Sequence, residues 1–253
     1  MKTTVRRGEV RTAISEESRT RLKRLLQRIA GSANVPALGK WRNMSSDDLW
    51  WQIVQQVCVM GSARGMEAMA QDKKRKAAFK EETSLRNWKR HRFDAKYLAG
   101  VMRAFAATRF HRRAARTLQK ITNTRTAVRG GHVVLLENFP RVRDVNVRRD
   151  ALMIRCPVFK RKSASDFMIS VGLSHDVIAL DQRIVGTLRK YLGFNLPFQR
   201  VQASRAIYLS VEATLRIVCR EAGSSLAILD RALFRFEGMT AIQYIIEHGL
   251  DRR

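Results

Sequence analysis

Helical periodicity is the feature of this chain that most restricts its fold. Apolar residues recur every three or four positions along residues 49–60 and again along 206–221, which is the spacing of one face of an α-helix. The chain has only 4 prolines and 14 glycines among 253 residues, so a many-stranded fold would lack turns. The sequence therefore predicts an all-α fold.

Start and stop signals flank both helical runs. The polar segment 46–48, Ser-Asp-Asp, precedes the first run, and Gly61 follows it. Gly223 ends the second run, and two serines then open another helix. Hydroxyl and carboxylate side chains accept hydrogen bonds from the unpaired backbone N–H groups at helix starts, and glycine adopts the left-handed conformation at helix ends. We expect helix boundaries at these positions.

Two regions differ from this helical pattern. Residues 133–139, VVLLENF, have strand character and lie between a Gly-Gly pair and Pro140. Residues 1–40 are basic and polar, with one helical candidate over 17–29. We expect residues 1–40 to form a basic N-terminal arm or an added helix beyond the core, and residues 41–253 to form the main domain.

The size and apolar content of the chain suit a globular protein. Its 253 residues are enough for one large domain or two tightly joined subdomains, and 45% hydrophobic residues suffice for a core. No apolar stretch approaches the ~20 residues of a membrane span, and no signal-peptide pattern opens the chain. We expect a cytoplasmic protein without a membrane partner.

The net charge points to a polyanionic partner. The formal charge of +27 is well above what solubility requires. Basic residues cluster in 73–76, 89–92 and 109–116, and Arg109, Arg112 and Arg113 in the last cluster are candidate DNA contacts. The alternative is a set of solvated helix faces. Aromatic residues among these clusters would offer rings to bases, namely Trp88, Phe93, Phe105 and Phe110.

The cysteines and histidines do not predict a metal site. Cys58, Cys156 and Cys219 lie far apart, and no two form a C-x-x-C pair. Cys58 and Cys219 stand among apolar residues, where a small buried side chain is the usual role. The five histidines show no pair at helical spacing. We expect neither a metal nor another cofactor.

The stretch from Lys162 to Asp181, KSASDFMISVGLSHDVIALD, predicts a helix, a glycine stop and an aspartate that opens a second helix. Gly172 is the stop, and Asp181 is placed as an N-cap. The chain must double back between them, which would bring Lys162 and Asp181 toward one cleft, with His175 in the intervening loop. The alternatives are that Lys162 only contacts phosphate, that Asp181 only caps its helix and that His175 is a solvated loop residue.

Two segments carry a family resemblance. RRDALMIRCPVFKRKSASDFMISVG (148–172) and IALDQRI (178–184) resemble the core of the helix-hairpin-helix DNA glycosylases, and within them the archaeal and bacterial type 2 8-oxoguanine DNA glycosylases. Residues 47–63 and 208–234 are similar to flanking family helices. The resemblance implies two helical subdomains with a helix-hairpin-helix motif, at about 149–172, at the central cleft.

The resemblance also implies a reaction. Lys162 matches the nucleophile that opens a K-x-A-S-x-F helix, and Asp181 matches the aspartate that completes the site. Such an enzyme flips a modified base, 8-oxoguanine or one like it, out of duplex DNA and excises it. A Schiff base on Lys162 would give AP lyase activity without a cofactor. The implied protein is a monomer associated with the bacterial or archaeal nucleoid.

Some positions depart from the family pattern. The family glycines before the nucleophile are replaced at residues 158–160, so Lys160 and Arg161 are expected to hold a DNA phosphate through their side chains, with Arg183 as a further DNA contact. Phe234 replaces the tryptophan beside the base pocket, and the family's C-terminal lysine has no counterpart. The alternatives are the same chemistry on another modified base, such as one in phage DNA, or a non-catalytic DNA-binding protein.

Overall fold

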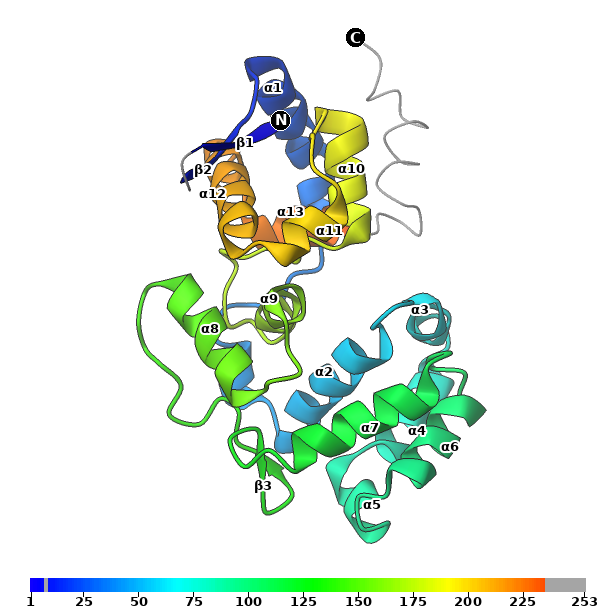
Figure 1. Ribbon diagram of the computed structural model, residues 1–253. Helices are drawn as coiled ribbons and strands as arrows, with labels where there is room; N and C mark the ends of the chain where they lie inside the picture. Colours follow the sequence, from blue (N-terminus) through cyan, green and yellow to red (C-terminus); the bar gives the residue numbers. More distant parts are fainter. Residues whose placement is uncertain (7–8, 235–253) are drawn as a thin grey trace. The chain divides into compact units, whose positions relative to one another are not determined.

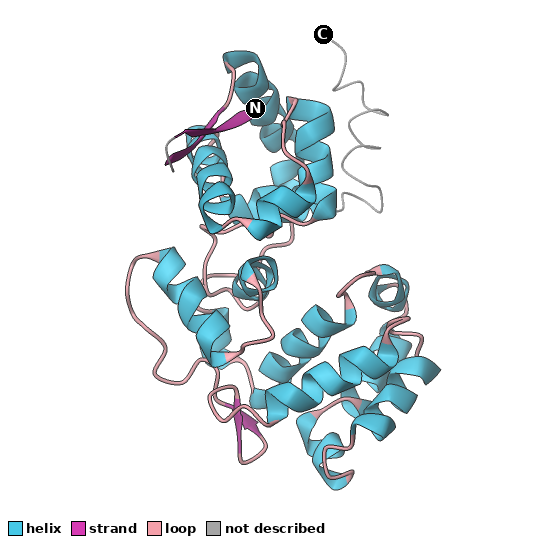
Figure 2. Cartoon of the chain, viewed as in Figure 1, coloured by secondary structure: helices cyan, strands magenta, loops and turns pink. Residues whose placement is uncertain are grey.

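Helices carry most of the chain, as the periodicity predicts. The computed structural model describes residues 1–6 and 9–234, and Figure 2 shows helices joined by loops, with two small sheets. The expected all-α fold is confirmed, since each sheet has only two strands. Across the described residues, no helix has the length and apolar character needed to cross a membrane.

The chain divides into two units. Among the described residues, unit 1 combines those of 1–38 with 172–234, and unit 2 consists of residues 39–171. Unit 1 therefore forms from two segments that are far apart in sequence, and unit 2 forms from a single continuous one.

Most helices of unit 2 follow one another through short connections, and the exception is the long segment between Thr122 and Val145 (Figure 1). The ends of α2 show how local sequence sets these boundaries. The Ser45 hydroxyl accepts the Asp48 N–H at 3.1 Å, and Gly61 follows the helix with a φ of 85°. The elements are the 3-10 turn η2 (Lys40–Asn43), α2 (Ser46–Cys58), α3 (Arg64–Ala70), α4 (Lys73–Glu82), α5 (Leu85–Arg90), α6 (Ala95–Ala104), α7 (His111–Thr122), β3 (Val128–Arg129), β4 (His132–Val133), α8 (Val145–Arg155) and α9 (Arg161–Ser170).

Aromatic side chains fill the core of unit 2. Trp50 and Trp88 are buried with ring centroids 5.9 Å apart, and each indole N–H donates to a backbone carbonyl. Phe93 and Phe105 pack their rings against buried aromatic rings. The predicted surface of aromatic rings is therefore wrong for Trp88, because its ring is needed in the core, whereas Phe110 is 38% exposed.

The predicted strand at 133–139 is wrong apart from its first residue. Val133 ends the two-residue strand β4, which pairs with β3 across a turn in which Gly130 and Gly131 have φ of 63° and 87°. The following residues form turns, although most of their apolar side chains are buried. The apolar run reflects burial without strand pairing.

Unit 1 contains the two chain segments in one packed body. Figure 1 shows α1, α10, α12 and α13 close together, and α13 contacts the other three helices. The elements are β1 (Lys2–Arg6), β2 (Glu9–Ala13), α1 (Glu16–Ile29), the 3-10 turn η1 (Ala30–Ser32), α10 (Gln182–Leu192), α11 (Phe198–Ala203), α12 (Arg205–Glu221) and α13 (Leu226–Phe234).

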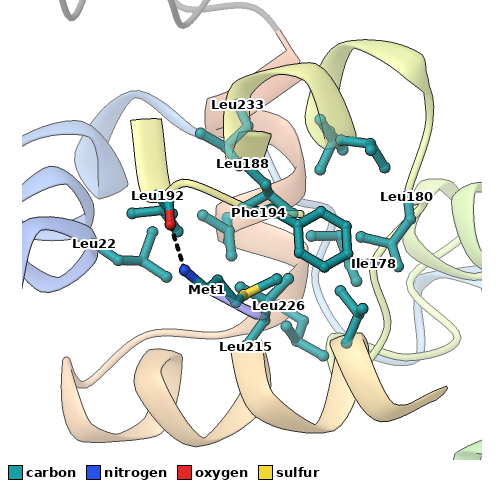
Figure 3. Packing of buried hydrophobic residues seen from close by; sticks show 14 of the residues in the cluster. Met1, Leu22, Ile178, Leu180, Leu188, Leu192, Phe194, Leu215, Leu226 and Leu233 are labelled. Atoms are coloured by element: carbon teal, nitrogen blue, oxygen red, sulfur yellow. Dashed lines mark hydrogen bonds between the residues drawn. The ribbon is translucent and has the colours of Figure 1, made fainter. Parts of the chain in front are cut away.

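The N-terminal segment belongs to the core of unit 1. Leu22, Leu25 and Leu26 of α1 are at most 2% exposed and pack with residues of α10, α12 and α13. Figure 3 shows Met1 and Leu22 in this cluster, with the Met1 amine donating to the Leu192 carbonyl. The expectation of an arm or added helix beyond the core is therefore corrected, because α1 has an apolar face that is buried here.

A hairpin of β1 and β2 precedes α1 and was not predicted. Thr3 and Thr12 face each other with hydroxyls 2.8 Å apart, and the Thr214 hydroxyl on α12 donates to the Thr12 carbonyl at 2.9 Å. The sequence signal was the alternation of threonine and valine with charged residues on either side of residues 7–8. The basic character of the segment hid it.

Candidate active site

Helices α8 and α9 are joined by a tight turn in unit 2. The Cys156 N–H donates to the Leu152 carbonyl and the Phe159 N–H donates to the Cys156 carbonyl, each at 2.9 Å. The Phe159 side chain is 1% exposed, and its ring lies 5.3 Å from that of Phe167. Within residues 158–160, Phe159 is therefore an aromatic anchor for the turn.

The first turn of α9 carries three basic residues in a row. Lys160 is the N-cap, and its N–H donates to the Ser163 hydroxyl at 2.9 Å, which donates back to the Lys160 carbonyl at 3.0 Å. The Lys160 side chain is exposed, and that of Arg161 is partly exposed. The DNA-binding role of Lys160 and Arg161 stays a prediction.

Lys162 lies in this first turn on a helix that is otherwise well packed. Its Nζ is 3.5 Å from the Asp166 carboxylate one turn later, and its side chain is 25% exposed. Ala164 and Phe167 are fully buried, and α9 contacts α2 and α8. The backbone of Lys162 is therefore fixed, and Asp166 is a neighbour that the sequence did not predict.

Asp181 is the N-cap of α10 in unit 1, as predicted. Its Oδ1 accepts the Ile184 N–H at 2.8 Å, and its side chain is partly exposed. The preceding helix α9 ends at Ser170, and Gly172 follows with a φ of 67°. The predicted glycine stop and aspartate cap are therefore confirmed as local structure.

Side chains from α12 and α13 hold the backbone that leads into Asp181. The Ala179 N–H donates to the Asp230 carboxylate at 2.6 Å, and the Ile178 N–H donates to the Glu212 carboxylate at 3.1 Å. Asp230 and Glu212 are each 1% exposed. Buried carboxylates are costly unless they are well bonded, so their presence indicates that this segment is held in one conformation.

Tyr208 completes this network. Its buried hydroxyl accepts the Leu180 N–H at 3.2 Å and donates to the Ile178 carbonyl at 2.6 Å, and Gln202 donates to the Leu180 carbonyl at 2.7 Å. Sequence reasoning missed these residues. The available signal was a carboxylate inside an apolar helical face: Glu212 stands between Tyr208 and Leu215 on the buried face of α12.

The predicted base-pocket residue and one predicted DNA contact lie together in unit 1. The Arg183 guanidinium sits over the Phe234 ring, 4.8 Å from its centroid. Arg183 is in the first turn of α10, and Phe234 is the last residue of α13, two helices that pack together. A cation–π contact of this kind is favourable and covers one face of the ring.

His175 is fixed within unit 1. Its Nε2 lies 2.7 Å from the Pro36 carbonyl, and its own carbonyl accepts the Ala227 N–H at 3.0 Å. The residue joins the loop before Asp181 to the segment after α1 and to the start of α13. It is partly buried, so the alternative of a solvated loop residue is wrong.

The cysteines are buried, as expected for Cys58 and Cys219. Burial raises the pKa of the Cys58, Cys156 and Cys219 thiols to about 12, so they are protonated at neutral pH. Within residues 1–6 and 9–234, no three histidine, cysteine or acidic side chains gather as a metal-binding group.

The other predicted DNA contacts lie at the start of α7 in unit 2. Arg109, Arg112 and Arg113 are exposed, and the Arg109 guanidinium sits 4.5 Å from the Phe110 ring centroid. None of the three forms an ion pair in the described part of the chain.

Lys162 belongs to unit 2 and Asp181 to unit 1, so their convergence on one site stays a prediction.

The arrangement of these helices matches solved structures. The crystal structure of a Methanocaldococcus jannaschii 8-oxoguanine DNA glycosylase superposes with a TM-score of 0.57 at 17% identity, covering 91% of this chain and 94% of that one. The chain shares this fold.

A second solved structure agrees. It is the Methanocaldococcus jannaschii 8-oxoguanine glycosylase/lyase in complex with a 15mer DNA containing 8-oxoguanine, with a TM-score of 0.55 and 20% identity over 85% of this chain and 88% of that one. The sequence matches no family model. Nor does it match any curated protein. The predicted resemblance is thus confirmed at the level of the fold.

Proposed function

We propose that this protein is a DNA glycosylase that excises a modified base, 8-oxoguanine or one like it, and cleaves the resulting abasic site. The observation that carries the proposal is the fold shared with an 8-oxoguanine DNA glycosylase over about nine-tenths of each chain. Within that fold, Lys162 opens a packed helix and Asp181 caps another. The protein would act as a monomer on duplex DNA, in the cytoplasm at the nucleoid, without a cofactor.

Lys162 is the proposed nucleophile. Its neutral Nζ would attack C1′ of the flipped nucleotide, and the bond from C1′ to the base would break with its electron pair leaving on the base, which takes up a proton. Opening of the sugar ring gives an imine between Nζ and C1′, and loss of a C2′ proton expels the 3′ phosphate. Asp166, 3.5 Å from Nζ, would pair with the ammonium form of Lys162, which must give up a proton to become the nucleophile.

Asp181 is the proposed electrostatic partner. The sugar becomes cationic as the bond to the base breaks, and a carboxylate beside it stabilises that charge. The same carboxylate caps α10, and the network of Tyr208, Glu212 and Asp230 fixes the backbone just before it. Preorganised charge of this kind needs little rearrangement during the reaction.

The remaining predicted contacts would hold the DNA. Lys160 and Arg161, at the start of α9, would contact a phosphate beside the flipped nucleotide through their side chains, as would Arg183 from α10. Phe234 would line the base pocket, with one face of its ring covered by Arg183. Because Phe234 stands where the resembled family carries a tryptophan, a modified base other than 8-oxoguanine is the second candidate substrate.

Borohydride trapping tests the proposal. Reduction of the imine links the enzyme covalently to its DNA, so wild type, Lys162→Gln and Asp181→Asn would be compared on duplexes that carry 8-oxoguanine, other modified bases or an abasic site. We expect an adduct with wild type and none with Lys162→Gln. Asp181→Asn should form it about 10²- to 10³-fold more slowly.

The matched control is Lys160→Gln, which removes an exposed lysine two positions before the nucleophile. It should weaken DNA binding and still form the adduct. An adduct that persists in Lys162→Gln would remove Lys162 from the mechanism. If wild type forms no adduct on any duplex but binds DNA in a salt-dependent manner, the protein is a non-catalytic DNA-binding protein with this fold.

A further inference from the structure

Two adjoining cavities in unit 2 hold basic side chains that the proposed chemistry does not use. One, of about 700 Å³, lies where the start of α3 meets the loop between α6 and α7. The other, of about 420 Å³, lies between α6 and α7. Arg103 and His111 line both, so the cavities adjoin, and we refer to them together as the α6–α7 trough.

The walls of this trough combine basic residues with small ones. Ala99 and Gly100 leave space along α6, and Ser62 and Gly65 do so at the other end. Among the described residues, no aspartate or glutamate lines either cavity. The basic lining residues are Arg64, Lys96, Arg103, Arg109, His111, Arg112 and Arg116.

The trough carries an excess of positive charge, and the acids near it, Glu81 and Glu82, line a neighbouring hollow with Lys96 and Gly100. The sequence has nine lysines and arginines but no acidic residue between Asp94 and Glu137. Of the basic lining residues, none forms an ion pair within the part of the chain that the structure describes. Elsewhere such pairs form readily, as between Arg86 and Glu81 at 2.8 Å. Like charges gathered in this way repel one another and favour an anion between them.

Close backbone packing fixes the shape of the trough. A Cβ at Gly65 would lie 2.4 Å from the carbonyl oxygens of Ala106 and Ala107, so the start of α3 lies directly against the α6–α7 loop. A Cβ at Gly61 would lie 2.8 Å from the Phe110 ring, over which Arg109 sits. The basic side chains therefore project from a backbone whose position is set without a ligand.

We propose that the α6–α7 trough is a phosphate-binding site, separate from the predicted base-excising residues. Arginine donates two parallel N–H bonds to phosphate oxygens, and several arginines around one cavity suit a phosphate group. The source is either the backbone of a nucleic acid or a free phosphate ester. The nucleic-acid source rests on the proposed function, whereas the phosphate chemistry stands without it.

Binding to an undamaged duplex tests the nucleic-acid source. Fluorescence anisotropy over a range of salt concentrations would compare wild type with Arg103→Gln/Arg109→Gln. The control is Lys73→Gln/Lys74→Gln, which removes the same charge from exposed positions at the start of α4. We expect the slope of log affinity against log salt to become shallower by about 0.9 for each phosphate that the trough variant no longer neutralises. Relative to wild type, the fold loss of duplex affinity should be about ten times smaller for the control than for the trough variant.

A second pair of variants leaves every arginine in place, and one variant of the pair adds a negative charge. A Cβ at Gly100 would meet nothing within 4 Å, so larger side chains fit there on α6. Gly100→Glu would place a carboxylate in the trough, and Gly100→Gln has nearly the same size without the charge. We expect Gly100→Glu to lose duplex affinity and Gly100→Gln to keep it.

Titration with inorganic phosphate and with a nucleoside monophosphate tests the free-ester source. The readout is the set of backbone amide resonances of residues 108–112. If these resonances shift in wild type and Gly100→Gln but not in Gly100→Glu, while duplex affinity is the same in all variants, the source is a free phosphate. If neither duplex affinity nor these resonances respond, the proposal is overturned. No chemistry is measured, so a failure to trap an imine on Lys162 leaves the trough unaffected.

Discussion

The segments that carry Lys162 and Asp181 are held in place in different ways. The turn before Lys162 closes through bonds between residues at most four apart, such as that from Cys156 to Leu152. The backbone before Asp181 is instead bound by side chains that follow 22 to 51 residues later in the chain. The first can form from its own sequence, whereas the second exists only once α12 and α13 have docked.

Truncating the anchor of the local turn should have the largest effect on stability. Phe159 is 1% exposed and packs against Phe167, so Phe159→Ala would leave a cavity and lower the free energy of unfolding by about 3–5 kcal/mol. The control is Ile154→Ala on α8, since Ile154 is 75% exposed and its loss should change stability by less than about 0.5 kcal/mol. Urea unfolding measures the difference, and equal losses would show that the turn does not depend on its aromatic anchor.

Removal of one hydroxyl should loosen the segment before Asp181. Tyr208→Phe leaves the Leu180 N–H and the Ile178 carbonyl without this partner in a buried site, which costs about 1–3 kcal/mol. We also expect slower imine trapping, because the network positions Asp181.

The control for this change is Tyr97→Phe in unit 2. The Tyr97 hydroxyl donates to Glu82 at 2.8 Å in a partly buried site, so its loss should cost less and leave trapping unchanged. If Tyr208→Phe slows trapping in an Asp181→Asn background as much as in wild type, Tyr208 does not act through Asp181.

Substitutions at Asp181 separate its cap from its proposed role in catalysis. Asparagine caps helices about as well as aspartate, so Asp181→Asn should keep the stability of unit 1, and Asp181→Ala should lose about 1 kcal/mol. Both variants should be slow in the trapping assay. An Asp181→Asn protein with wild-type trapping would leave Asp181 as a cap alone.

The smallest expected effect on stability comes from Asp48, which forms the N-terminal capping box of α2 with Ser45, and this effect depends on pH. A hydrogen bond from Lys80, followed by one from Ser45, lowers the pKa of Asp48 below its ordinary value. The ionised Asp48 carboxylate therefore stabilises the folded protein at pH values above its ordinary pKa. This stabilisation is lost as the pH falls through the lowered pKa of the folded state. Asp48→Asn should reduce stability by less than about 1 kcal/mol at pH 7, because the pair is partly exposed. A difference in Tm from wild type that does not shrink in acid would contradict this assignment.

Local features were predictable from the sequence because they depend on neighbouring residues. The stop at Gly172 and the cap at Asp181 were both found at the expected positions. The burial of Cys58 and Cys219 followed from their apolar neighbours at helical spacing. The fold class and the family resemblance rest on the same kind of pattern, and the solved structures agree with them.

Other features could not be read from the sequence because they join distant segments. The network around residues 178–180 depends on Tyr208, Glu212 and Asp230, which no local pattern assigns to that backbone. The α6–α7 trough depends on the contact of Gly65 with the α6–α7 loop, about forty residues later in the chain.

The sequence by itself determined the helices, their ends and the large positive charge, since periodicity, caps and composition act over a few residues. The tertiary structure decided that α1 belongs to the core of unit 1 and that an apolar run at 133–139 is buried without forming a strand. It also decided which arginines gather around the α6–α7 trough, whose walls include no acidic residue among those described. Burial and ion pairing depend on which surfaces meet after folding, and that information is spread over the whole chain.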